Sequence, residues 1–192
     1  QELHCWLWRI GYRSYLSRIG RNADCLDLLV DRLLQTIQKA YNETRGTVHL
    51  IGHSLGGVLA LSAATLRPDI VASVITLGSP IRGIRSHPVV LEMTKIVRDR
   101  IRTAHREHSK PACFTGYCDC NAVSALQIPC PHSIQHTAVY TKTDGVVDWR
   151  VCVTDDPAAN IEVQGTHIGL VFNHWVYELI AQRLAQKVSW LT

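Results

Sequence analysis

The sequence lacks a long apolar run. No stretch approaches the roughly 20 consecutive apolar residues that a membrane-spanning helix needs. The first ten residues also lack the layout of a secretory signal peptide, in which a basic segment precedes an apolar one. This second absence carries little weight, because the secondary-structure pattern of the chain starts in mid-fold.

A broadly distributed positive charge is lacking as well. The formal net charge is +4. The segment 95–110 contains six Lys or Arg residues against two acidic ones, so its net positive charge equals that of the whole chain. Because the remainder is neutral, the sequence argues against a nucleic-acid-binding protein built on a wide basic surface.

Cysteine pairs with the usual zinc spacing are also absent. Cys113, Cys118 and Cys120 have C-x4-C-x-C spacing instead of the C-x2-C pairs of most zinc sites, which favours a local disulfide over a metal. Five of the seven cysteines lie between positions 113 and 152, which predicts at least one disulfide there and an extracytoplasmic or secreted location. Cys130 and Cys152 flank a predicted strand and are one candidate pair.

Helix-like and strand-like patterns alternate along the chain. Apolar residues recurring every three or four positions predict helices at 24–41, 88–108 and 173–190. Residues 3–8 resemble the end of a helix, and residues 55–66 are apolar nearly all round, which predicts a buried helix. Strands are predicted at 12–16, 47–51, 72–77, 137–141 and 161–163, and a loop at 109–133. This alternation predicts an α/β fold with a mostly parallel sheet and helices on both faces, in one domain spanning residues 1–192.

The segment Gly52-His53-Ser54-Leu55-Gly56-Gly57 joins a predicted buried strand to a predicted buried helix. It matches the G-x-S-x-G nucleophile elbow, in which a sharp turn presents the serine at a helix N-terminus where a developing oxyanion is stabilised. Side chains at the two flanking positions would collide, so glycine is expected to be required at both Gly52 and Gly56. The composition would give about 0.04 such patterns by chance. Ser54 is therefore the predicted nucleophile, while His53 is interpreted as a structural residue of the turn.

A serine nucleophile needs a histidine base, itself oriented by a carboxylate. In this kind of fold the chain order is serine, acid, histidine, each following a strand. His167 lies between the last predicted strand and the last helix, which selects it from the seven histidines after Ser54: His87, His105, His108, His132, His136, His167 and His174. For the acid, Asp144 before Gly145 is favoured, with Asp148 as the alternative; Asp155 and Asp156 fit a turn before Pro157.

Four segments of the chain resemble those of bacterial lipases and esterases of the α/β-hydrolase superfamily: G-H-S-L-G-G, L-G-S-P, T-D-G-V-V-D-W-R-V-C and G-T-H-I-G-L. The resemblance spans about residues 5–185. The resemblance implies Ser54 as nucleophile, Asp144 as acid, His167 as base and the Leu55 backbone N–H as one oxyanion donor. We expect a small-molecule or lipid ester as substrate, transient contact with a lipid surface, and no nucleic acid, metal or organic cofactor.

Two regions extend or depart from that resemblance. Residues 81–135 stand where such enzymes often carry a cap or lid over the serine, although the helix from Pro88 equally fits a surface helix packed on the sheet. The family also has a strand and a loop before its first helix, and that loop supplies the second oxyanion donor. We therefore expect about 20–40 further N-terminal residues, whose absence would leave a gap beside the strand at 47–51.

The resulting hypothesis is a serine carboxylic-ester hydrolase that works through an acyl-enzyme intermediate. An acyltransferase or a thioesterase with the same triad is the alternative, since the three residues do not distinguish these reactions. A non-catalytic binding protein on the same fold is a further alternative, against which the presence of all three residues argues.

Overall fold

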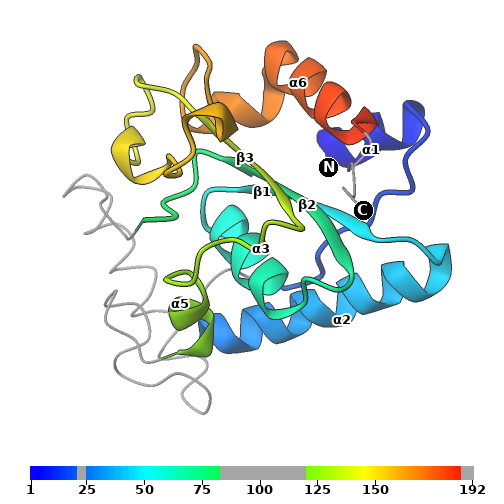
Figure 1. Ribbon diagram of the computed structural model, residues 1–192. Helices are drawn as coiled ribbons and strands as arrows, with labels where there is room; N and C mark the ends of the chain where they lie inside the picture. Colours follow the sequence, from blue (N-terminus) through cyan, green and yellow to red (C-terminus); the bar gives the residue numbers. More distant parts are fainter. Residues whose placement is uncertain (21–24, 83–119, 187–192) are drawn as a thin grey trace.

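The computed structural model describes residues 1–20, 25–82 and 120–186 (Figure 1). In this part of the chain the strands are β1 (Val48–His53), β2 (Val71–Leu77), β3 (Gln135–Tyr140) and β4 (Asn160–Glu162). The helices are α1 (Glu2–Arg9), α2 (Leu26–Thr44), α3 (Leu55–Leu66), α5 (Asn121–Ala125) and α6 (His174–Ala185), with 3₁₀ turns η1 (Trp149–Val151), η2 (Pro157–Ala159) and η3 (Ile168–Phe172).

The sheet has the order β1-β2-β3-β4, and all three strand pairs are parallel. The carboxyl ends of the strands lie side by side, with His53 opposite Leu77, Leu77 opposite Val139, and Tyr140 opposite Glu162. The loops that follow the strands therefore leave the same edge of the sheet. Ser54 follows β1, Asp144 follows β3 and His167 follows β4, so the topology brings the three predicted residues to one edge.

Helices cover both faces of the sheet, as predicted. One core lies under α2, α3 and α5 and includes Leu29, Leu59, Val74 and Ala122. The other lies under α1 and α6, which are neighbours in Figure 1, and includes Leu7, Leu77 and Ile180. Helix α3 lies between the sheet and α2, which explains why its sequence is apolar all round. None of the described helices is both long enough and apolar enough to cross a bilayer.

Two sequence predictions about local structure are wrong. Residues 12–16 form no strand, because Arg13 and Tyr15 both bind the Glu43 carboxylate of α2, at 2.7 and 2.8 Å, and hold the segment against that helix. The expected loop at 109–133 contains the short helix α5, whose first backbone N–H groups donate to the Asp27 carboxylate. The predicted helix at 88–108 and most of the predicted cap lie outside the described residues.

The candidate pairing of Cys130 with Cys152 is also wrong, because both are free thiols. Burial raises the pKa of Cys130 to about 11, and burial together with the nearby Asp144 and Asp148 raises that of Cys152 to about 12. A disulfide within 113–152 stays a prediction, since Cys113 and Cys118 lie outside the described residues.

Strand β1 has a partner strand on one side only in the described part of the chain. A cavity of about 590 Å³ flanks its other side. Residues of both cores line this cavity, including Leu33 and Ile37 from α2 and Leu7 from α1. The gap that the sequence predicted beside this strand is therefore present in the described part of the chain.

The imidazole of His136 on β3 should make the protein acid-sensitive. Its Nε2 lies 3.2 Å from Thr76 Oγ1, and burial lowers its pKa to about 4. Because the pKa of an unfolded histidine is about 6.5, the unfolded state takes up the proton first as the pH falls. The contribution of His136 to the free energy of unfolding is complete above pH ~6.5. It is lost as the pH falls from ~6.5 to ~4, by up to about 3 kcal/mol.

Urea unfolding at pH 7 and pH 4.5 tests this expectation. The free energy of unfolding of His136→Gln minus that of wild type should be about 2 kcal/mol higher at pH 4.5 than at pH 7. His132→Gln is the matched control on an exposed position, and it should keep the acid dependence of the wild type. A difference between His136→Gln and wild type that is the same at both pH values would contradict the assignment.

Candidate active site

Ser54 lies at a strained turn between β1 and α3. Its φ of 53° and ψ of −125° are unusual for a residue other than glycine, and such backbone strain concentrates at functional sites. The turn is held by its backbone N–H, which donates to the Leu77 carbonyl at 2.9 Å, and by its carbonyl, which accepts from Gly57 N at 3.0 Å. Leu55 is the first residue of α3, so its N–H belongs to the helix-terminal donors without an intrahelical partner.

Glycines permit the close approach of β1 and α3 at this turn. A Cβ at Gly52 would overlap the backbone of Gly56 and Gly57. A Cβ at Gly57 would overlap the Ser79 side chain and lie 2.9 Å from the Gly52 carbonyl. At Gly56, by contrast, an added Cβ meets nothing within 4 Å. The steric requirement expected for both flanking glycines of the motif therefore falls on Gly52 and Gly57, and the expectation for Gly56 is wrong.

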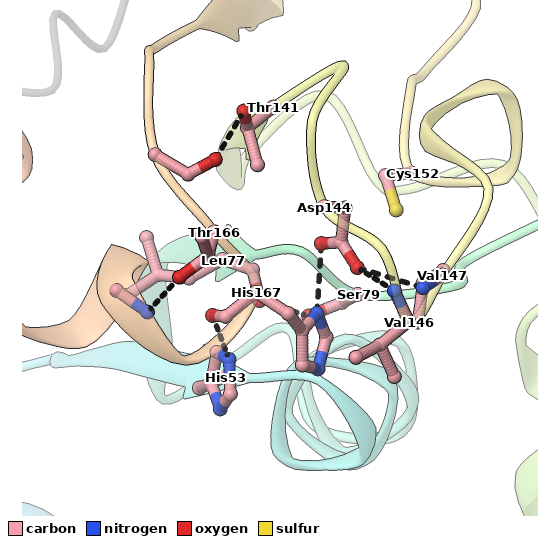
Figure 2. A network of polar contacts seen from close by, with 12 residues as sticks. His53, Leu77, Ser79, Thr141, Asp144, Val146, Val147, Cys152, Thr166 and His167 are labelled. Atoms are coloured by element: carbon pink, nitrogen blue, oxygen red, sulfur yellow. Dashed lines mark hydrogen bonds and ion pairs between the residues drawn. The ribbon is translucent and has the colours of Figure 1, made fainter. Parts of the chain in front are cut away.

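Asp144 is a buried carboxylate in the loop after β3, with a relative exposure of 6%. Its Oδ1 accepts hydrogen bonds from Val146 N at 3.0 Å and Val147 N at 2.7 Å, and its Oδ2 lies 2.7 Å from His167 Nδ1 (Figure 2). Burial alone would raise the pKa of Asp144, but the bonds from His167 and from the two backbone N–H groups lower it below its usual value. The carboxyl group is therefore ionised at neutral pH.

His167 is as buried as Asp144, at 6%, and faces it. An ionised carboxylate only accepts hydrogen bonds, so Nδ1 of His167 carries the proton and Nε2 is left as the basic nitrogen. The loop before His167 is bound to the acid loop, because the hydroxyls of Thr141 and Thr143 donate to the Gly165 carbonyl at 3.0 and 2.6 Å.

Asp148, the alternative acid, has a different role in the structure. Its Oδ1 accepts from Arg150 N at 3.0 Å as the cap of η1, and the carboxylate pairs with the Arg150 guanidinium at 3.3 Å. Asp156 caps η2, and Asp155 pairs with Arg82. Of these four carboxylates, Asp144 is the one that binds His167.

The other histidines considered as bases have different surroundings. His136 pairs with Thr76, and His132 is exposed. The ring centroid of His174 lies 4.5 Å from that of Trp175. His87, His105 and His108 lie outside the described residues.

Sequence reasoning missed two residues that border the acid–histidine pair. Gly78 has a φ of 55°, and a Cβ there would lie 3.2 Å from both Asp144 Oδ2 and His167 Nδ1. Its place in the segment L-G-S-P was the available signal. His53 binds the backbone of His167, a contact that its interpretation as a structural residue of the turn does not include.

One group of metal-type ligands occurs in the part of the chain that the structure describes. Cys25, Asp27 and Cys120 have ligand atoms within 4.8 Å of one another. The two sulfurs are 3.5 Å apart, and the Asp27 carboxylate accepts from the backbone at the start of α5. The group belongs to the contact between α2 and α5 and contains none of the three predicted triad residues.

Comparisons with known proteins identify the family of the chain. Residues 20–154 match the model of the PGAP1-like alpha/beta domain family. Triacylglycerol lipases of Pseudarthrobacter phenanthrenivorans and Burkholderia plantarii are 38% identical over 66 residues, which are 34% of this chain and 21% and 18% of theirs. The chain therefore spans about a fifth of the length of these curated relatives.

Solved structures show the same architecture. A lipase-esterase related protein of Clostridium acetobutylicum superposes with a TM-score of 0.57 at 16% identity, covering 90% of this chain and 79% of that one. The α/β hydrolase MGS-MChE2, from the sediment metagenome of the Mar Chica lagoon in Morocco, superposes with a TM-score of 0.50 at 21% identity, covering 80% and 70%. The predicted α/β-hydrolase fold is confirmed, and the chain belongs to the PGAP1-like α/β domain family.

Proposed function

We propose that the protein is a serine hydrolase of carboxylic esters. The observation that carries the proposal is the buried Asp144–His167 pair, joined at 2.7 Å, at the sheet edge from which Ser54 also leaves its strand. A strained serine at a helix N-terminus and a histidine oriented by an ionised carboxylate are the parts that acyl transfer needs. The names of the curated relatives, triacylglycerol lipases, support an ester of a lipid or of a small molecule as the substrate.

The reaction proceeds in two stages. Ser54 Oγ attacks the ester carbonyl while His167 Nε2 takes its proton, and Asp144 stabilises the imidazolium that forms. The Leu55 N–H, at the start of α3, donates to the oxyanion. His167 then protonates the departing alcohol and leaves an acyl group on Ser54. A water molecule repeats the sequence, giving the carboxylic acid and the free serine.

Covalent labelling and ester hydrolysis test this proposal together. A fluorophosphonate should label wild-type protein on the peptide that contains Ser54, because phosphonylation needs the same serine, base and oxyanion donor. A series of p-nitrophenyl esters of increasing acyl length should be hydrolysed, and the best chain length defines the acyl pocket. Labelling without hydrolysis of any ester would favour an acyltransferase or a thioesterase, and absence of both would favour a non-catalytic binding protein.

A further inference from the structure

His53 connects the strand that bears the nucleophile to the loop that bears the base. It is the last residue of β1, directly before Ser54. Its Nε2 lies 2.9 Å from the backbone carbonyl oxygen of His167, which is 114 positions away in the sequence. The two imidazole rings are tilted by 47° with centroids 4.6 Å apart (Figure 2).

The chemistry of this contact determines where the proton of His53 lies. A carbonyl oxygen only accepts, so Nε2 of His53 must be the donor. Burial, the largest influence, lowers the pKa of His53, and the nearby His167 acts in the same direction, while its hydrogen bond to the carbonyl and the charge of Asp144 oppose this. His53 is therefore a neutral donor at pH 7, which places no second positive charge beside the imidazolium of His167.

His167 is held at three atoms, by two contacts from one loop and one contact from a strand. Its backbone N donates to the Asp144 carbonyl at 3.2 Å and its Nδ1 bonds the Asp144 carboxylate at 2.7 Å. Both of those partners belong to the loop after β3, so they orient the histidine relative to the acid. The third contact, from His53, comes from the strand that ends at Ser54, so it relates the base to the nucleophile.

We propose that His53 is a positioning residue, which keeps the base at the correct distance from the nucleophile through the carbonyl of His167. This inference rests on the proposed function, because it takes Ser54 and His167 as the reacting pair. The two contacts with Asp144 orient His167 relative to the acid but do not set its distance from Ser54, and a displacement of 1 Å costs about 10²-fold in rate. The hydrogen bond from β1 restrains that distance.

A matched pair of substitutions separates the N–H donor from the space that the ring fills. Methionine and glutamine have similar length and shape, but only glutamine carries a donor close to the position of Nε2. In the full-length protein, His53→Met should lower kcat for a p-nitrophenyl ester by about 10- to 100-fold with KM within about two-fold. His53→Gln should restore kcat to within about three-fold of wild type.

His49→Met is the control for removing a half-buried histidine from the same strand. The Nδ1 of His49 lies 2.7 Å from Ser73 Oγ, well away from the acid–histidine pair, so this variant should keep the wild-type kcat even if its melting temperature falls. The rate of Ser54 labelling by a fluorophosphonate should fall in His53→Met by the same factor as kcat.

The outcomes distinguish this inference from the proposed function. If wild-type protein is neither labelled at Ser54 nor active, the proposed function is wrong, and the role of His53 is wrong with it. Equal kcat and labelling rates in wild type and His53→Met would overturn the role of His53 alone. Equal losses in His53→Met and His53→Gln would also overturn it, because they would assign the effect to the ring instead of the N–H donor.

Discussion

Replacing Ser54 with alanine should lower kcat for ester hydrolysis by on the order of 10³-fold or more. In the proposed mechanism the substitution removes the one oxygen that attacks the carbonyl, so neither the base nor the oxyanion donor has a nucleophile to assist. The turn should survive, because its hydrogen bonds to Leu77 and Gly57 are made by the backbone of residue 54 and not by its side chain. Steady-state kinetics and a thermal melt of the same preparation measure both effects.

Ser124→Ala is the matched control for this experiment. Ser124 is exposed on α5, a helix that packs on α2 and α3 away from the acid–histidine pair, so its hydroxyl should not affect the rate. Activity of Ser54→Ala near the wild-type level would show that another group is the nucleophile and would remove the basis of the proposed mechanism.

Replacing Asp144 with asparagine should lower kcat by about 10³- to 10⁴-fold. The amide is neutral, so it no longer stabilises the imidazolium of His167. An amide N–H turned toward Nδ1 would also favour the tautomer with its proton on Nε2, which cannot act as the base. The substitution preserves the size of the side chain, and hydrolysis of the best p-nitrophenyl ester at pH 8 is the measurement.

Asp148→Asn is the built-in comparison, since it makes the same chemical change four residues later. It removes an ion pair with a largely exposed arginine, which is worth little, and asparagine caps a helical turn about as well as aspartate. We expect kcat within about two-fold of wild type. If Asp148→Asn is the more damaging of the two substitutions, the acid has been assigned to the wrong residue.

The parts of the fold that follow from local patterns could be predicted from the sequence. An all-apolar helix is predicted at 55–66, and α3 has these bounds. Its residues are apolar all round because the sheet covers one side of the helix and α2 the other. Strands that alternate with helices pair in parallel, and parallel strands direct their following loops to one edge. The expected places of Ser54, Asp144 and His167 therefore depended on chain order and not on any contact.

The parts that were wrong or missed depend on partners far away in the sequence. Residues 12–16 look like a strand, but the carboxylate of Glu43, about 30 positions later, holds them outside the sheet. Helix α5 is too short for a periodic pattern, and Asp27, from another helix, caps it. The motif likewise predicts that glycine is required at both positions flanking Ser54, Gly52 and Gly56. The packing of β1 on α3 instead requires glycine at Gly52 and Gly57.

The sequence by itself determined the layered α/β architecture and the residues that carry the candidate chemistry, because both arise from periodicity and from the order of motifs along the chain. Only the tertiary structure decided which carboxylate meets His167 and what its neighbours do. Asp144 and Asp148 lie four residues apart after the same strand, and the path of the backbone between them directs one to His167 and the other to Arg150. The contact of His53 with His167 joins residues 114 positions apart, a separation over which no local pattern carries information.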